Sequence, residues 1–356
     1  MNPYERVFNR LNGAYVDKIP NLNIIMTFAA KHINVSYKKF VTDYKTLVKA
    51  NIMCCEEFGI DMVSAISDPC RELFDFGAEI IFPDDGVPYC REYLIKEYSD
   101  IKKVKMKDPL QSTRMLDRIK AVELYSKKVK KHYPILGWVE GALAEAADLR
   151  GVNSMMLDIT DAPDFLLELL ELCTEQAISF ALEQIRAGAD FIGIGDAVAS
   201  LVGPESYTRF ALPFEKRIVD EIQKAGCRAR IHICGNISKI LDFLGETGAE
   251  IIDVDWMVDF KTAVSKFEGK ASACGNFDPV AILLEGDRKT VENAVLACIN
   301  SGNNRTFIAA GCEVPKNTSP KNLKAVDETL KKHSPGFNGK IISEIEMGFK
   351  KPSEKY

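Results

Sequence analysis

Short apolar runs alternate with longer amphipathic segments along most of this chain. Runs rich in Val, Ile and other apolar residues predict strands at 60–67, 133–139, 191–195, 228–233, 250–254, 271–273 and 306–310, and an eighth at either 22–27 or 78–82. Between them lie helix patterns such as 163–187, with Asp161 as the expected N-cap and Gly188 as the expected end. Strand–helix alternation over about 300 residues predicts an α/β fold of the (β/α)8 TIM-barrel type, with a doubly wound open sheet as the alternative.

The domain organisation follows from what interrupts this alternation. The chain of 356 residues contains no repeat of solenoid length and no linker rich in Pro, Gly or Ser. We therefore expect a single barrel domain over residues 1–336. The last stretch, 337–356, has an apolar patch before a polar end and is expected to form a C-terminal tail that docks as a helix or reaches a second subunit of a homodimer.

Charge and hydropathy exclude several classes of partner. The chain carries 46 Lys and Arg against 51 Asp and Glu, a net charge of −5, which gives no electrostatic reason to bind nucleic acid or an anionic membrane. No apolar run is long enough to span a bilayer, and the first residues do not resemble an export signal, so a cytoplasmic location is expected. Ten cysteines in such a protein are expected to be thiols, core residues or metal ligands.

One strand brings two metal-binding side chains to the same face. His232 and Cys234 are two residues apart in the predicted strand 228–233 and its end, so they project together, and Gly235 breaks the strand immediately afterwards. Cys312 has the same position, after an apolar strand and a glycine. In a closed barrel the carboxyl ends of distant strands converge on one mouth, where barrel enzymes build their active sites.

These three residues suit zinc. Two thiolates and an imidazole are borderline-soft ligands, and three protein ligands leave one position open for a substrate or water. Two other interpretations stay open on the residues alone. Each side chain could simply fill the core, or Cys234 could be a nucleophile with His232 as its base.

Further motifs give the chain a recognisable pattern. They are ERVFNRLNG at 5–13, DKIP at 17–20, ISDP at 66–69, GWVEG at 137–141, AADLRG at 146–151, GDAVAS at 195–200, HICGN at 232–236, GNFDP at 275–279 and GCEVP at 311–315. With them the chain resembles the uroporphyrinogen decarboxylase superfamily, and within it the branch of zinc-dependent corrinoid methyltransferases. The His-x-Cys motif and the late Gly-Cys pair are typical of that branch.

The resemblance implies a zinc-dependent exchange of a methyl group with a corrinoid. It implies His232, Cys234 and Cys312 as zinc ligands, and a distant similarity to zinc methionine synthases adds Asp255 or Asp253 as a fourth. The corrinoid is expected on a separate partner protein, because the Asp-x-His-x-x-Gly pattern of a corrinoid-binding domain is absent. The other substrate would be coenzyme M, another thiol, a folate, or a small methyl donor.

Polar residues at other strand ends are the remaining candidates. Asp196 and Glu140 are expected to be catalytic or to orient the substrate, and Asp68, Asn236 and Asn276 to bind the cofactor. Glu140 stands where many superfamily members have a Gly-Pro pair, so the identity of the substrate is open. Each of these side chains could instead cap a loop.

Two other functions are compatible with the superfamily. One is a metal-free decarboxylase or lyase, and the other is a non-catalytic corrinoid- or tetrapyrrole-binding protein. Porphyrinogen decarboxylation itself is disfavoured, because the segment 21–30 lacks the arginines that hold the substrate carboxylates in decarboxylases.

Overall fold

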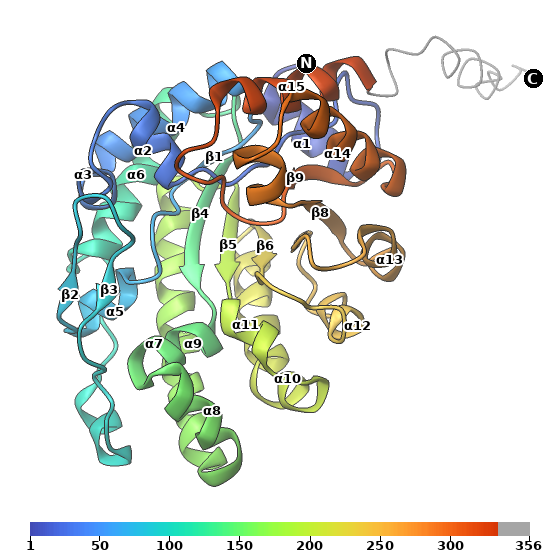
Figure 1. The fold of residues 1–356 in the computed structure, drawn as a ribbon. Helices are drawn as coiled ribbons and strands as arrows, with labels where there is room; N and C mark the ends of the chain where they lie inside the picture. Colours follow the sequence, from blue (N-terminus) through green and yellow to red (C-terminus); the bar gives the residue numbers. More distant parts are fainter. Residues whose placement is uncertain (334–356) are drawn as a thin grey trace, which may run out of the picture.

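The computed structural model describes residues 1–333, and its centre is a curled parallel sheet (Figure 1). Seven strands lie in the order β1-β4-β5-β6-β7-β8-β9, and all neighbours are parallel. Their bounds are β1 Val63–Ser64, β4 Ile135–Glu140, β5 Phe191–Gly195, β6 Arg228–His232, β7 Ile251–Val254, β8 Ser272–Phe277 and β9 Phe307–Ala310. The predicted fold class is confirmed. The predicted tail at 337–356 lies outside the described residues.

The eighth position of the barrel is closed by an irregular segment around Asn21. Asn21 bridges Ile308 of β9 in parallel, and the Leu22 amide donates to the Ile308 carbonyl at 3.0 Å. On its other side the Asn21 carbonyl accepts from the Asp61 amide at 2.8 Å, just before β1. Of the two predicted sites for an eighth strand, the one beginning at residue 22 is thus next to the barrel. The other forms β2 (Ile80–Ile81), which pairs antiparallel with β3 (Tyr89–Cys90) in a separate sheet.

Two strands differ in length from the prediction by more than one residue. The expected strand 60–67 shortens to β1, and the Asp61 carboxylate just before it pairs with Arg6 and Lys18 and accepts from the Asn21 amide. Strand β8 extends four residues beyond the expected 271–273, and Asn276 therefore lies inside a strand rather than at its end. The side-chain amide nitrogen of Asn276 donates to the Asp255 and Val258 carbonyls, and these hydrogen bonds join β8 to the loop after β7.

Helices cover the outside of the sheet. They are α1 Pro3–Leu11, α2 Thr27–His32, α3 Tyr37–Thr42, α4 Tyr44–Phe58, α5 Arg71–Phe76, α6 Arg114–Val129, α7 Ala142–Arg150, α8 Val152–Asp161, α9 Pro163–Ala187, α10 Pro204–Phe210, α11 Leu212–Lys224, α12 Leu241–Leu244, α13 Phe260–Lys266, α14 Arg288–Ser301 and α15 Pro320–His333, with short turns η1 Tyr98–Lys103, η2 Ala197–Leu201 and η3 Pro279–Leu284. No helix among residues 1–333 combines the length and the apolarity needed to cross a membrane.

Helix α9 matches its predicted bounds. It packs against β4 and β5 with a buried face that includes Leu169, Cys173 and Phe180. It ends at Gly188, which has a φ of 113°, a conformation that favours glycine. The predicted N-cap is wrong, because Asp161 is the last residue of α8 and Ala162 precedes the first turn of α9.

The two ends of the barrel differ. In Figure 1 the strands run away from α1 and the N terminus, and α7, α8 and α10 lie at the carboxyl end. The loops that follow β4, β5, β6 and β9 therefore gather at one mouth. The site described next lies there.

Candidate active site

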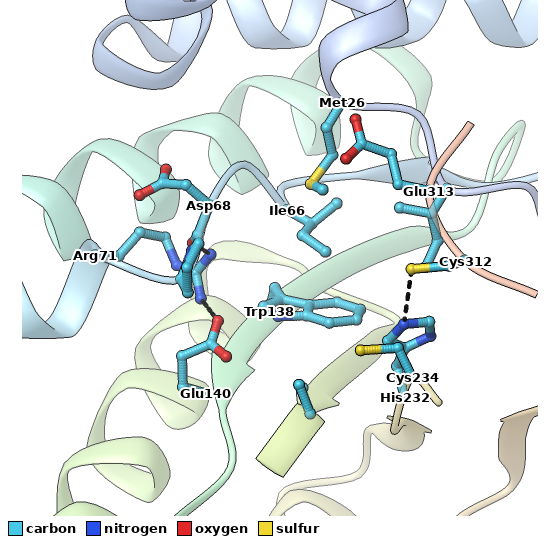
Figure 2. A pocket seen from close by; sticks show the side chains of 14 residues that line it. Met26, Ile66, Asp68, Arg71, Trp138, Glu140, His232, Cys234, Cys312 and Glu313 are labelled. Carbon is cyan, nitrogen blue, oxygen red and sulfur yellow. Dashed lines mark hydrogen bonds and ion pairs between the residues drawn. The ribbon is translucent and has the colours of Figure 1, made fainter. Parts of the chain in front are cut away.

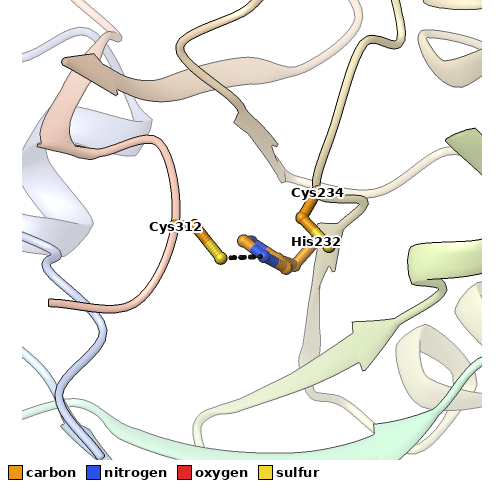
Figure 3. Close-up of side chains that lie close together, drawn as sticks. All are labelled: His232, Cys234 and Cys312. Carbon is orange, nitrogen blue, oxygen red and sulfur yellow. Dashed lines mark hydrogen bonds between the residues drawn. The ribbon is translucent and has the colours of Figure 1, made fainter. Parts of the chain in front are cut away.

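The mouth of the barrel brings together His232, Cys234 and Cys312 (Figure 3). One ligand atom from each lies within 4.8 Å of the others, and His232 Nε2 is 3.8 Å from Cys312 Sγ. In a tetrahedral zinc site, bond lengths of about 2.0–2.3 Å place neighbouring N and S ligand atoms about 3.6 Å apart. The donor set and its spacing therefore fit zinc with small side-chain adjustments. No other group of three such side chains occurs in the described part of the chain.

His232 is oriented from behind by a buried carboxylate. Its Nδ1 lies 3.0 Å from Asp253 Oδ2, and the two residues are register partners in β6 and β7. Asp253 is itself held by the buried Arg230, whose Nε is 2.9 and 3.0 Å from its two oxygens. A carboxylate on one ring nitrogen fixes the tautomer and directs the other nitrogen to a metal. Asp253 thus lies on the opposite side of the imidazole from the cysteines.

Asp255 connects the two loops that carry the cysteines. Its Oδ2 accepts from the Gly235 amide at 2.5 Å, and its Oδ1 accepts from the Trp256 amide at 2.6 Å. A Cβ on Gly311 would lie 2.8 Å from Asp255 Oδ1, so the loop before Cys312 approaches closely because residue 311 is glycine. Asp255 is not a member of the cluster. Both of its oxygens accept from backbone N–H groups instead, and its expected role as a fourth ligand stays a prediction.

The contacts among the three cluster residues shift the pKa of each of them. Burial lowers the pKa of His232, but its contacts with Asp253 and Cys312 outweigh burial and raise that pKa to about 10. The contact with Cys312 lowers the pKa of Cys234, while the contact with Cys234 and burial raise the pKa of Cys312. Cys234 is therefore the first of the two thiols to ionise.

The cluster faces a cavity of about 210 Å³ (Figure 2). Its wall is mostly apolar, with charged groups at the ends. The lining residues are Ile24, Met26, Ile66, Asp68, Pro69, Arg71, Trp138, Glu140, Gly195, Ala197, His232, Cys234, Cys312 and Glu313. This volume is below the range of about 300–1,000 Å³ that is usual for drug-sized ligands, so the cavity suits a small molecule.

Trp138 separates the cluster from the far end of the cavity. Its ring centroid is 6.2 Å from that of His232, and Figure 2 shows it between the cluster and the Arg71–Glu140 pair. The indole lies against Gly193 and Gly195 of β5, where a Cβ on Gly195 would be 3.0 Å from Trp138 Cζ2 and one on Gly193 would be closer still. The two glycines of β5 therefore make room for this ring.

Glu140 points into the cavity as part of a buried charged group. The Arg71 guanidinium donates to Glu140 Oε1 at 2.5 Å, and the Glu140 amide donates to Glu72 Oε1 at 3.0 Å. Burial raises the pKa of Glu72, Glu140 and Glu145, and raises that of Asp148 to about 7. The Arg71 guanidinium pairs with Glu140, and burial shifts the other carboxyl groups of this set toward their protonated form.

The structure does not place Asp196 in the cavity. Asp196 is fully buried, and its Oδ1 accepts from the Ala144 amide at 2.8 Å, in the first turn of α7. A Cβ on Gly141 would lie 2.5 Å from Asp196 Oδ2, so the side chain fills the space that this glycine leaves. Asp196 therefore does not line the cavity in this structure, and its expected role toward the substrate stays a prediction. Its carboxyl caps α7.

The three expected cofactor-binding residues have different surroundings. Asp68 lines the cavity, but its carboxylate is held by Arg114, with Arg114 Nη2 2.6 Å from Oδ2. Asn236 is exposed and accepts from the Ser238 amide in a turn outside the cavity. The Asn276 side chain is bonded to the loop after β7, as described above. Only Asp68 of these three lies at the cavity.

Sequence reasoning missed several residues that line the cavity. Arg71 begins α5, and Trp138 lies two residues before Glu140 in β4. The Thr27 amide and hydroxyl each donate to Glu313 Oε1 at 2.6 Å, which joins the loop after β9 to the start of α2. The alternation in β4 was the available signal for Trp138, because residues 138 and 140 project to one face of the strand. No local pattern points to Arg71.

Comparison with known proteins places the chain in a family. The model of the family described as "Uroporphyrinogen decarboxylase (URO-D)" matches residues 2–333. The chain belongs to the uroporphyrinogen decarboxylase family. Family members that it resembles include the methylcobamide:CoM methyltransferase MtbA of Methanosarcina mazei, 29% identical over 93% of this chain and 98% of that protein. The uroporphyrinogen decarboxylase of Carboxydothermus hydrogenoformans is 23% identical over 66% of this chain and 68% of that protein.

A solved structure supports the same fold. A methyltransferase from Methanosarcina mazei superposes with a TM-score of 0.86, at 24% identity, over 93% of this chain and 99% of that one. The predicted resemblance to the family is confirmed, and the homologues include enzymes that are named for methyl transfer from a methylcobamide.

Proposed function

We propose that the chain is a zinc-dependent methyltransferase that exchanges a methyl group between a corrinoid on a partner protein and a small thiol, folate or methyl donor. The observation that carries the proposal is the cluster of His232, Cys234 and Cys312 on the wall of a small cavity at the barrel mouth. The methylcobamide substrate named for MtbA supports the corrinoid as one partner.

The roles of the residues follow from their positions. His232, Cys234 and Cys312 would hold zinc, with Asp253 orienting the imidazole and Asp255 positioning both cysteine loops. Zinc at this position would act as a Lewis acid that lowers the pKa of a substrate thiol, so that sulfur reacts as a thiolate at neutral pH. The apolar wall of Ile24, Ile66 and Trp138 excludes water from the reacting sulfur.

The size of the cavity supports separate binding places for the two substrates. A corrin macrocycle is far larger than a cavity of about 210 Å³, so it would lie over the mouth while the small substrate occupies the interior. In the thiol reaction the methyl group moves from cobalt to sulfur, cobalt keeps the electron pair of the broken bond, and the thiol proton leaves to solvent. A porphyrinogen decarboxylase activity is not favoured, because Arg71, the one arginine that lines the cavity within residues 1–333, is fully buried behind Glu140.

Metal content and methyl transfer test the proposal together. Purified wild-type protein is expected to bind about one equivalent of zinc and to consume methylcobalamin on addition of a thiol, folate or small methyl acceptor, followed by absorbance. Cys312→Ser is expected to lose most of the zinc and the activity while keeping its circular dichroism spectrum. Cys90→Ser is the matched control, because Cys90 lies in the separate β2–β3 sheet.

Two results would contradict the proposal. One is wild-type protein that binds no zinc when it is purified from zinc-supplemented cells. The other is a Cys312→Ser variant that retains wild-type zinc content, which would return the three residues to a role in the core.

A further inference from the structure

The cavity offers its occupant no unpaired positive charge among the described residues. Arg71 is its only arginine, and no lysine lines it. The Arg71 side chain has no exposed surface, while the Glu140 side chain in front of it is 9% exposed. Arg71 donates to Glu140 Oε1 and to the Asp68 carbonyl, and its Nε is 3.4 Å from Glu72 Oε2. The guanidinium is therefore surrounded by acceptors of the protein itself.

The second guanidinium near the cavity is also neutralised. Arg114 pairs with Asp68 through Nη2 at 2.6 Å and Nη1 at 3.3 Å, and it donates to the Val41 carbonyl. The zinc site adds no net charge, because two thiolates balance a divalent ion. Glu313 also lines the cavity and accepts from Thr27, so the wall has no excess of positive charge before a substrate enters.

The carboxyl groups behind this wall can lose a proton and become negative, but they cannot become positive. Glu72 and Glu140 lie against Arg71, Glu145 and Asp148 lie close enough to interact with its charge, and both oxygens of Glu145 are without a hydrogen-bond partner. If a cation enters, one of these groups can lose its proton and balance it. Apart from His232, which would be neutral as a zinc ligand, no other unpaired lining residue among those described can become positive, and an unpaired anion in a small apolar cavity is strongly disfavoured.

On the basis of the proposed function, we propose that the cavity selects small methyl acceptors or donors whose remote end is uncharged or cationic, and that it excludes anionic ones. This substrate class differs from the anionic thiol 2-mercaptoethanesulfonate, the CoM named for the homologue MtbA. Glu140 is the specificity-determining residue, because its carboxyl lies at the end of the cavity remote from the cluster and covers Arg71.

Three thiols with the same two-carbon skeleton test the selection. They are 2-mercaptoethanol, 2-mercaptoethylamine and 2-mercaptoethanesulfonate, which are neutral, cationic and anionic. Binding to the zinc-loaded full-length protein is measured by calorimetry at one pH, and methylcobalamin consumption is followed separately. We expect the neutral and cationic thiols to bind at least about tenfold more tightly than the sulfonate.

A paired variant adds the missing charge. Ile66 lines the cavity above Trp138, so Ile66→Lys supplies an unpaired cation, while Ile66→Met is uncharged and of similar length. The sulfonate is expected to gain about tenfold in affinity over 2-mercaptoethanol in Ile66→Lys relative to Ile66→Met. Comparing the two variants cancels the different intrinsic acidities of the thiols.

The outcomes separate this inference from the function on which it rests. If the sulfonate binds wild-type protein as tightly as the other two thiols or more tightly, the inference is wrong and the methyltransferase proposal stands. If none of the three thiols binds and no small acceptor consumes methylcobalamin, both are wrong. If Ile66→Lys does not fold, the wild-type comparison alone decides.

Discussion

At the residue scale, the site is a small set of donors whose orientation depends on their neighbours. His232 ends β6 and Cys234 lies in the loop directly after it, while Cys312 comes from a loop 78 residues further along the chain than Cys234. Asp253 and Asp255, two residues apart around the end of β7, serve these donors differently. Asp253 contacts the imidazole, and Asp255 bonds the backbone next to Cys234 and lies against Gly311.

Asp255→Asn is expected to weaken zinc binding by about 10- to 100-fold without unfolding the protein. An asparagine keeps one acceptor oxygen but presents an NH2 group to either the Gly235 or the Trp256 amide, so either the Cys234 loop or the turn after β7 loses a hydrogen bond. Competition with a chromophoric chelator measures the affinity. Asp259→Asn, at the exposed start of α13, is the control and is expected to leave the zinc affinity unchanged. Equal affinities in the two variants would show that Asp255 does not position the loops.

At the element scale, β4 and β5 together shape the cavity. They pair in register from Leu136 and Phe191 to Glu140 and Gly195, which brings Trp138 opposite Gly193. The two glycines of β5 do not belong to a dinucleotide-binding motif, because the third glycine of that motif is missing from the sequence. Their function is steric, since each leaves the space that the indole occupies.

Gly193→Ala is expected to lower the free energy of unfolding by about 3 kcal/mol, because the new methyl group overlaps the Trp138 ring in a packed barrel. Urea unfolding followed by Trp fluorescence measures both the stability and the displacement of the ring. Gly203→Ala is the matched control, since a Cβ at Gly203 has open space around it, and its effect is expected to stay within about 1 kcal/mol. Equal losses in the two variants would refute the steric role of Gly193.

At the scale of the whole molecule, buried carboxyl groups couple stability to pH. Glu215 of α11 is fully buried, and its Oε2 accepts from the Tyr207 hydroxyl. Burial and the nearby Asp196 raise the pKa of Glu215 to about 8, although the bond from Tyr207 lowers it. The folded state therefore holds a proton that the unfolded state has released, and stability falls as the pH rises through about 8.

Glu215→Gln is expected to flatten this dependence, because glutamine mimics the protonated acid and has no proton to lose. Free energies of unfolding from urea titrations at about pH 6 and pH 9 should fall less between the two pH values in the variant than in wild type. The exposed Glu205→Gln on α10 should keep the wild-type dependence. A slope unchanged by Glu215→Gln would mean that other groups carry the effect.

The sequence by itself determined the α/β barrel, the bounds of α9 and the three residues of the cluster. These are local properties, since hydrophobic periodicity and side-chain alternation require only neighbours in the chain. The family motifs are also short local patterns, so the sequence alone was enough to predict the relatives. The assignment of cluster residues to one mouth needed only the rule that parallel strands end together.

Only the tertiary structure decided what surrounds the cluster. Asp196 and Glu140 both occupy strand ends, yet one caps a buried helix and the other enters the cavity, because Gly141 leaves space for the first and Arg71 pairs with the second. Asp255 and Asp253 also differ through their surroundings, since Asp253 contacts the His232 imidazole and Asp255 accepts from backbone amides. Such contacts join residues from distant elements, so their partners, charges and exposure depend on packing that no local pattern encodes.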